Sequence, residues 1–104
     1  MSGVRQGLPA RRAHETFKFR HDGQNYTAGL GFFENGLLAE VFLDCGKSGS
    51  AVETNARDGA VALSLLLQHG CPVETIRIAM TRDAEGRPFG ALGRVLDHAC
   101  GYEK

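Results

Sequence analysis

One short stretch of this chain combines residue types that bind phosphate. Gly46-Lys47-Ser48 stands between a strand-like and a helix-like segment, and Ser50 follows. Backbone amides at the start of a helix, together with an ammonium group and hydroxyls, can hold a phosphate group. The spacing excludes a Walker A motif, because that motif needs a glycine at position 41, where this chain has Val41. The stretch predicts either an anion site or a plain strand-to-helix connection in which Ser50 caps the helix.

The N-terminal residues add further cations. Residues 1–13 lack hydrophobic periodicity, which predicts an extended arm ahead of one domain over residues 14–104. Arg11 and Arg12 join Lys47, Ser48 and Ser50 as the candidate ligand-binding residues, through charge-assisted hydrogen bonds to phosphate. A basic arm can bind nucleic acid, but it can equally pack on its own body or on a neighbouring protein. Because the formal net charge of the whole chain is zero, nucleic acid is the less expected partner.

The cysteines and histidines do not form a recognisable catalytic or metal-binding set. Cys45, Cys71 and Cys100 are odd in number and widely spaced, which predicts free thiols in a reducing cytoplasm. His69 and Cys71 are the closest His/Cys pair, and two ligands do not make a zinc site. We therefore expect no catalytic residue, no metal and no cofactor.

The chain also lacks the signals of a membrane or secreted protein. No run approaches the roughly 20 apolar residues that a bilayer-spanning helix needs. The N-terminus has arginines but no apolar stretch of the kind found in a secretory signal. We expect a cytoplasmic protein that does not contact a membrane.

Three strands must position the loop, and turn signals separate them. Residues 15–20 alternate polar and apolar, and Asp22-Gly23 marks a hairpin turn. A second strand follows, and Asn35-Gly36 marks the next turn. The third strand is expected from Leu37 to Asp44. The pattern predicts an antiparallel meander. Its inner face is expected to carry the apolar residues Tyr26, Ala28, Leu30, Phe32, Leu37, Ala39, Val41 and Leu43.

A long central helix and two shorter helices complete the predicted α+β fold. The long helix begins after Ser50 and ends before Gly70, which suits the left-handed position past a helix end. Pro72 opens a short helix that runs to about residue 80, and a last helix runs over about residues 90–100. The inward stripe of the long helix is expected to contain Val52, Ala56, Ala60, Leu63 and Leu67.

Apolar residues also fall on faces that point away from the predicted core. Val61 and Leu65 lie opposite the inward stripe of the long helix, and the second face of the sheet carries an aromatic at Phe42. Gly29 and Gly31 leave a bare strip on that face, for close approach of a ligand or another backbone, or else they mark a bulge. A second subunit is one way to cover these faces, so we expect a homodimer. Phe33 and Leu38 are expected on the same face as Phe42.

Several short motifs resemble a known family. They cover about residues 8–80 and read Leu8-Pro9-x-Arg11-Arg12, Glu40-x-Phe42, Lys47-x-Gly49-Ser50 and Leu67-Gln68-x-Gly70-x-Pro72. The chain resembles the TSCPD-type domain, which occurs at the C-terminus of adenosylcobalamin-dependent ribonucleotide reductases and in short free-standing relatives. It departs from that family in lacking the Thr-Ser-Cys-Pro-Asp motif and a C-terminal cysteine cluster.

The resemblance implies a link to deoxynucleotide synthesis without the reductase activity, because 104 residues cannot supply the catalytic barrel of the reductase. It implies a non-catalytic accessory or regulatory module that binds a nucleotide or another phosphate ligand and has a ribonucleotide reductase subunit as a partner. The alternative is a homodimeric protein-interaction module with no small-molecule ligand.

Overall fold

The computed structural model describes residues 13–46 and 50–102. Strands β1 (His14–His21), β2 (Gln24–Phe32) and β3 (Leu38–Cys45) form one antiparallel sheet in the order β1-β2-β3. Helices α1 (Ala51–Gln68), α2 (Val73–Ala79) and α3 (Ala91–Ala99) follow. The predicted α+β fold, a three-stranded meander followed by one long and two shorter helices, is confirmed. The 1–13 arm falls almost wholly outside the described residues.

The two hairpin turns form where the Asp-Gly and Asn-Gly pairs predict them. Asp22 and Gly23 both have positive φ, 49° and 75°, which is the conformation that a two-residue hairpin turn needs. Gly36 has a φ of 86° in the second turn, where its amide donates to the carbonyl of Phe33. These residues adopt left-handed conformations at low cost, so local chemistry sets the meander.

Helix α1 begins and ends with capping interactions. The hydroxyl of Ser50 accepts a hydrogen bond from the amide of Glu53 at 3.1 Å, which satisfies one of the unpaired donors of the first turn. At the other end Gly70 has a φ of 91°, and the Cys71 amide donates to the carbonyl of Leu66. That pairing is a Schellman motif. Both helix boundaries are therefore set by the sequence itself.

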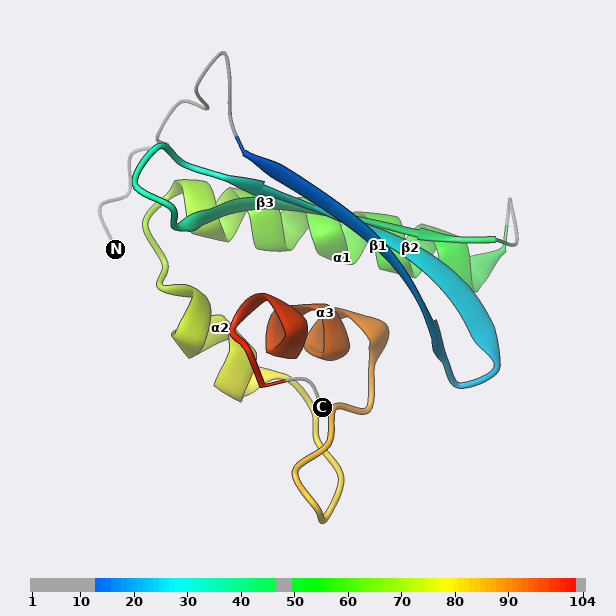
Figure 1. Cartoon of the computed structure of the whole chain (residues 1–104). Coiled ribbons are helices and arrows are strands. Elements are labelled where there is room, and N and C mark those ends of the chain that lie inside the picture. The colour runs from blue at the N-terminus through cyan, green and yellow to red at the C-terminus, as the bar shows by residue number, and fades with distance from the viewer. Residues whose placement is uncertain (1–12, 47–49, 103–104) are drawn as a thin grey trace.

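The hydrophobic core lies on one face of the sheet, which we call the inner face. Figure 1 shows α1 running along the sheet, with α2 and α3 on the same side of it. Leu30, Val95 and Leu96 are fully buried there. The inward residues of α1 are Ala56, Ala60, Leu63 and Leu67, as the periodicity predicts. The same periodicity predicts Val52 among them, but this residue, in the first turn of the helix, is 40% exposed.

One part of the predicted strand pattern is wrong. The register shifts between Gly31 and Phe32, so that Phe32 pairs with Leu38. Leu38 consequently joins the core cluster instead of the opposite face, and Leu37 precedes the strand and is exposed. Phe33 lies beyond the end of β2 and is buried. The extra residue at this irregularity is Ala39 on β3, which the register skips, whereas Gly29 and Gly31 are both paired, so the glycines do not mark a bulge of their own strand.

Candidate functional site

The sheet face that points away from the core, the outer face, is a regular grid of side chains. The pairing of the strands aligns its members in three rows. Residues on one face of a strand recur every second position, so each row takes one residue from each strand. The first row is His14, Gly31 and Glu40; the second is Thr16, Gly29 and Phe42; the third is Lys18, Thr27 and Asp44.

The glycine strip in the middle of this grid is filled by neighbouring side chains. A Cβ atom at Gly31 would lie 2.7 Å from Cγ of Glu40, and one at Gly29 would lie 3.4 Å from Cδ2 of Phe42. The imidazole of His14 approaches Gly29 from the other side, and its ring centroid is 6.5 Å from that of Phe42. The strip therefore lets the side chains of β3 lie across β2, which flattens the face.

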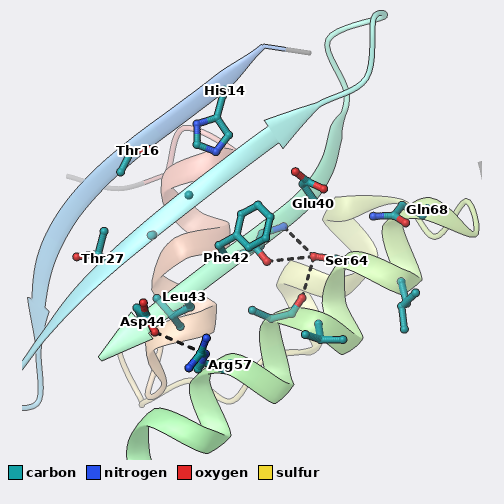
Figure 2. A pocket seen from close by; sticks show the side chains of 16 residues that line it. His14, Thr16, Thr27, Glu40, Phe42, Leu43, Asp44, Arg57, Ser64 and Gln68 are labelled. Carbon is teal, nitrogen blue, oxygen red and sulfur yellow. Dashed lines mark hydrogen bonds and ion pairs between the residues drawn. The ribbon is translucent and has the colours of Figure 1, made fainter. Parts of the chain in front are cut away.

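Helix α1 closes the edge of the sheet next to this face. The hydroxyl of Ser64 accepts from the amide of Val41 at 2.8 Å and lies 3.1 Å from the carbonyl oxygen of the same residue (Figure 2). Gln68, which is 3% exposed, donates from its amide nitrogen to the carbonyl of Ala39. These contacts occupy backbone groups that an edge strand otherwise presents for pairing.

Together the outer face and the flank of α1 form a hollow of about 630 Å³, which we call the outer groove. Its exposed apolar members are Phe42 (54%), Val61 (60%) and Leu65 (41%). Asp44 and Arg57 form an exposed ion pair at one end, with 3.7 Å between the carboxylate oxygen and the guanidinium Nε. Figure 2 shows Phe42 standing on β3 beside α1. An apolar patch with a charged rim is the chemistry of a protein-binding surface.

The predicted phosphate-binding residues lie mostly outside the described residues. This applies to Arg11, Arg12, Lys47 and Ser48. Ser50 is described, and its hydroxyl serves as the helix cap. A polar hollow of about 550 Å³ adjoins Gly46, the residue before this loop. It is lined by eight residues, Lys18, Phe19, Asn25, Tyr26, Thr27, Asp44, Cys45 and Gly46.

A second cluster of charged residues, which the sequence did not single out, holds the C-terminal helices together. Arg82 binds the carboxylate of Asp97 through two nitrogens, at 2.8 and 3.0 Å, and Arg77 reaches the same carboxylate at 3.3 Å. The hydrogen bonds from Arg82 lower the pKa of Asp97, with Arg77 adding to the effect against the opposing effect of burial. Arg77 also pairs with Glu74 and lies over the ring of Tyr102. Arg82 and Arg77 are 15 and 20 residues from Asp97 along the chain, so no local sequence pattern marks the cluster.

This cluster and the cysteines show no catalytic geometry. The arginines of the cluster are already bound to carboxylates or carbonyls, which suits a structural role. Cys45 is buried, Cys71 and Cys100 are half-buried, and all three are free thiols. Burial raises the pKa of Cys100, which disfavours the reactive thiolate. Within residues 13–46 and 50–102, no group of three or more His, Cys, Asp or Glu is placed to hold a metal ion.

No helix in the described part of the chain is both long and apolar enough to cross a bilayer. The fold and the outer groove thus define a small α+β module with a surface suited to protein contact.

Comparison with known proteins relates this module to one class of enzyme. The vitamin B12-dependent ribonucleotide reductase of Agrobacterium fabrum is 36% identical over 81 residues, which is 78% of this chain and 6% of that protein. The enzyme of the same name from Bradyrhizobium diazoefficiens is 34% identical over 77 residues, or 74% of this chain and 6% of its own length. No family model and no solved structure matches. The chain is related to a segment of these reductases and spans about 6% of their length.

Proposed function

We propose that this chain is a TSCPD-type, non-catalytic accessory module of vitamin B12-dependent ribonucleotide reduction. The observation that carries the proposal is the similarity to two such reductases over about three quarters of the chain. Because the matched segment is only 6% of each reductase, most of the residues of those enzymes have no counterpart here. In this proposal the module acts together with a reductase.

The outer groove supports action through protein contact. Its exposed apolar side chains are Phe42, Val61 and Leu65; His14 and Thr16 are exposed beside them, and the Asp44–Arg57 ion pair lies at one end. Such a composition fits a macromolecular surface better than a substrate pocket, which would enclose polar groups aimed at one small molecule. The module is expected in the cytoplasm, where deoxynucleotide synthesis takes place.

A reconstituted reductase assay tests this proposal. The purified chain is added to the Agrobacterium fabrum reductase with adenosylcobalamin and a ribonucleotide substrate, and product formation is followed. We expect no turnover by the chain alone and a severalfold change in the rate of the reductase. A parallel arm uses the same reductase with its matched 81-residue segment deleted, so that the chain can replace that segment. An unchanged rate in both arms, with no binding by sedimentation, contradicts the proposal.

As a second function, we propose that the loop before α1 binds a nucleotide or another phosphate ligand. The polar hollow beside Gly46 supports it, since Lys18 lines that hollow and Lys47 follows Gly46 in the sequence. The proposed ligands are Arg11, Arg12, Lys47, Ser48 and Ser50. One first-turn amide is already bound by Ser50, so the ligand would use the cations and the remaining amides.

Calorimetric titration with nucleoside triphosphates tests this second proposal. Wild type should release heat and Lys47→Ala should bind about tenfold or more weakly, because a charge-assisted hydrogen bond is lost. Arg87→Ala is the matched control, because it removes a surface cation far along the chain whose partners are Asp83 and Glu85. Equal binding by wild type and Lys47→Ala would assign any phosphate site elsewhere.

A further inference from the structure

We propose that the outer groove is filled by the same groove of a second copy, face to face across a twofold axis parallel to β2. This inference rests on the proposed function in one respect, namely that the chain works through protein contacts. It deepens that function by assigning the groove to a second copy, so that the reductase meets the module as a dimer and through another surface.

The centre of the face provides the apolar contact. Phe42 projects from the middle row of the grid and is 54% exposed. Its neighbours along β3, Val41 and Leu43, lie on the inner face and are buried. Val61 and Leu65 extend the same apolar surface onto α1. Large exposed apolar groups gathered on one surface mark interaction sites, and an aromatic anchor at the centre is typical of them.

The glycines make the face flat enough for a second sheet. Gly29 and Gly31 lie on the central strand, so the line of the proposed axis carries no side chain of its own at these positions. Packed sheets lie about 10 Å apart with their strands nearly aligned. In this arrangement β1 of one copy lies over β3 of the other, and Phe42 meets Thr16 of the second copy.

The charges of the face complement one another under this symmetry. Lys18 on β1 and Asp44 on β3 stand in the same row, on either side of Thr27. A twofold axis parallel to β2 keeps the rows and exchanges the outer strands, so each Lys18 faces Asp44 of the other copy. Asp44 keeps its exposed contact with Arg57 of its own chain, at 3.7 Å, and Lys18 adds a second cation beside the carboxylate. The arrangement forms two equivalent ion pairs, as an isologous interface requires. A second copy is thus a partner whose charge pattern fits the groove.

Pairing with the edge of β3 is closed to a second copy, because α1 covers that edge. Ser64 and Gln68 already bind the outward backbone groups of Val41 and Ala39. A second copy therefore cannot extend the sheet by pairing with β3 at these positions. The open surface beside that edge is the outer face itself.

Sedimentation velocity over a range of concentrations, supported by light scattering, tests the dimer. Wild type should sediment as a dimer, and Val61→Glu should raise the dimer dissociation constant at least about tenfold by placing a charge in the apolar contact. Ile78→Glu is the matched control, since Ile78 is 65% exposed on α2 and does not line the groove. It should remain dimeric. Phe42→Ser, in the sheet, is a second variant should Val61→Glu disturb the helix.

Charge reversal tests the proposed symmetry. Lys18→Asp and Asp44→Lys should each weaken the dimer about tenfold or more, because like charges then face each other twice. An equimolar mixture of the two variants should restore dimers, since each facing pair again has opposite signs. Each variant chain carries only one of the two changes, so a contact between positions 18 and 44 within one chain does not explain such a rescue.

The outcomes separate this inference from the proposed function. Wild type that stays monomeric, or Val61→Glu and Phe42→Ser variants that dimerise like wild type, would overturn the groove as a self-association surface. Failure of the mixture to dimerise would overturn the proposed axis. None of these results depends on the reductase assay, and an unchanged reductase rate would not alter the dimer measurements.

Discussion

The two faces of the three-stranded sheet differ in residue type and in burial. On the inner face, Leu30, Val41 and Leu43 lie under the helices and have almost no contact with solvent. On the outer face, the alternate residues of the same strands include Gly29, Gly31, the exposed Phe42 and the charged residues Lys18 and Asp44. Because every strand contributes to both faces, the difference follows from the alternation of residue types along each strand and from the packing of α1, α2 and α3 on one face only.

The two faces therefore have different roles, one in folding and the other in association. Burial on the inner face supplies the hydrophobic free energy that holds a domain of this size together. The outer face contributes little to folding, because its apolar groups stay in water in the single chain. Substitutions on the inner face should therefore change stability, and substitutions on the outer face should change association.

The largest expected effect contrasts two leucines of α1 that are two residues apart. Leu63 is 4% exposed and faces the core, whereas Leu65 is 41% exposed and lines the outer groove. Leu63→Ala should lower the free energy of unfolding by about 2–5 kcal/mol, and Leu65→Ala by less than about 1 kcal/mol. Urea denaturation at a protein concentration too low for dimers measures both. Equal losses would mean that the two sides of α1 are equally buried, which would contradict the contrast between the two faces of the sheet.

The next effect concerns two carboxylates of very different surroundings. Asp97 is enclosed by Arg82 and Arg77, whereas Asp44 forms one exposed pair with Arg57 on the outer face. Asp97→Asn should lower the free energy of unfolding by about 1–3 kcal/mol, because the two guanidinium groups lose a charged partner. Asp44→Asn should cost at most about 1 kcal/mol.

The pH dependence of stability sharpens this second comparison. The pKa of Asp97 is lowered in the folded protein, so the unfolded chain takes up the proton first as the pH falls. The stabilisation is complete above the unfolded pKa, about 3.9, and is lost as the pH falls through the lower folded pKa. The gap in stability between wild type and Asp97→Asn should therefore be constant near neutral pH and shrink below about pH 4. A gap that stays constant down to about pH 2 would show that the carboxylate charge is not what stabilises the cluster.

A third comparison lies within the outer face, between its two glycines. A methyl group at Gly31 would lie 2.7 Å from Cγ of the buried Glu40, whereas one at Gly29 would make only ordinary contacts with His14 and Phe42. Gly31→Ala should lower the free energy of unfolding by about 1–2 kcal/mol through overpacking. Gly29→Ala should change it by less than about 0.5 kcal/mol. Thermal unfolding of both variants measures the two losses in stability. A larger loss for Gly29→Ala than for Gly31→Ala would contradict the tighter packing against Gly31.

The sequence predicts the elements well because their signals are local. The turn pairs Asp22-Gly23 and Asn35-Gly36 define the hairpins, and the caps at Ser50 and Gly70 define α1. The exposed stripe of Val61 and Leu65 also follows from helical periodicity. Each of these predictions depends on a few neighbouring residues, and the structure confirms them.

The parts that the sequence misses depend on distant residues. The alternating pattern predicts Leu38 on the outer face, whereas the extra residue Ala39 in β3 puts Leu38 in the core. Asp97 binds Arg77 and Arg82, which come from other segments of the chain. The sequence alone does not distinguish an arginine that binds a carboxylate from one that is exposed to solvent. The glycine strip was recognised, but its filling by Glu40 and Phe42 follows from cross-strand pairing. The pattern thus predicts the elements but not how distant side chains meet.

The smallest expected effect concerns the residue that separates the two faces at the edge of the sheet. Ser64 binds both the amide and the carbonyl of Val41, and its hydroxyl also lies 2.8 Å from the carbonyl oxygen of Ala60. Ser64→Ala removes these bonds, but the site is only partly buried, so water can replace some of them. We expect a loss of about 1 kcal/mol in the free energy of unfolding, with faster hydrogen exchange at the amide of Val41. Ser64→Thr keeps the hydroxyl and should protect that amide, because a helical threonine can also bond to the preceding turn. Equal exchange in wild type and Ser64→Ala would mean that α1 shields the edge of β3 by packing alone, and the edge would then stay closed to a second copy without any hydrogen bond from Ser64.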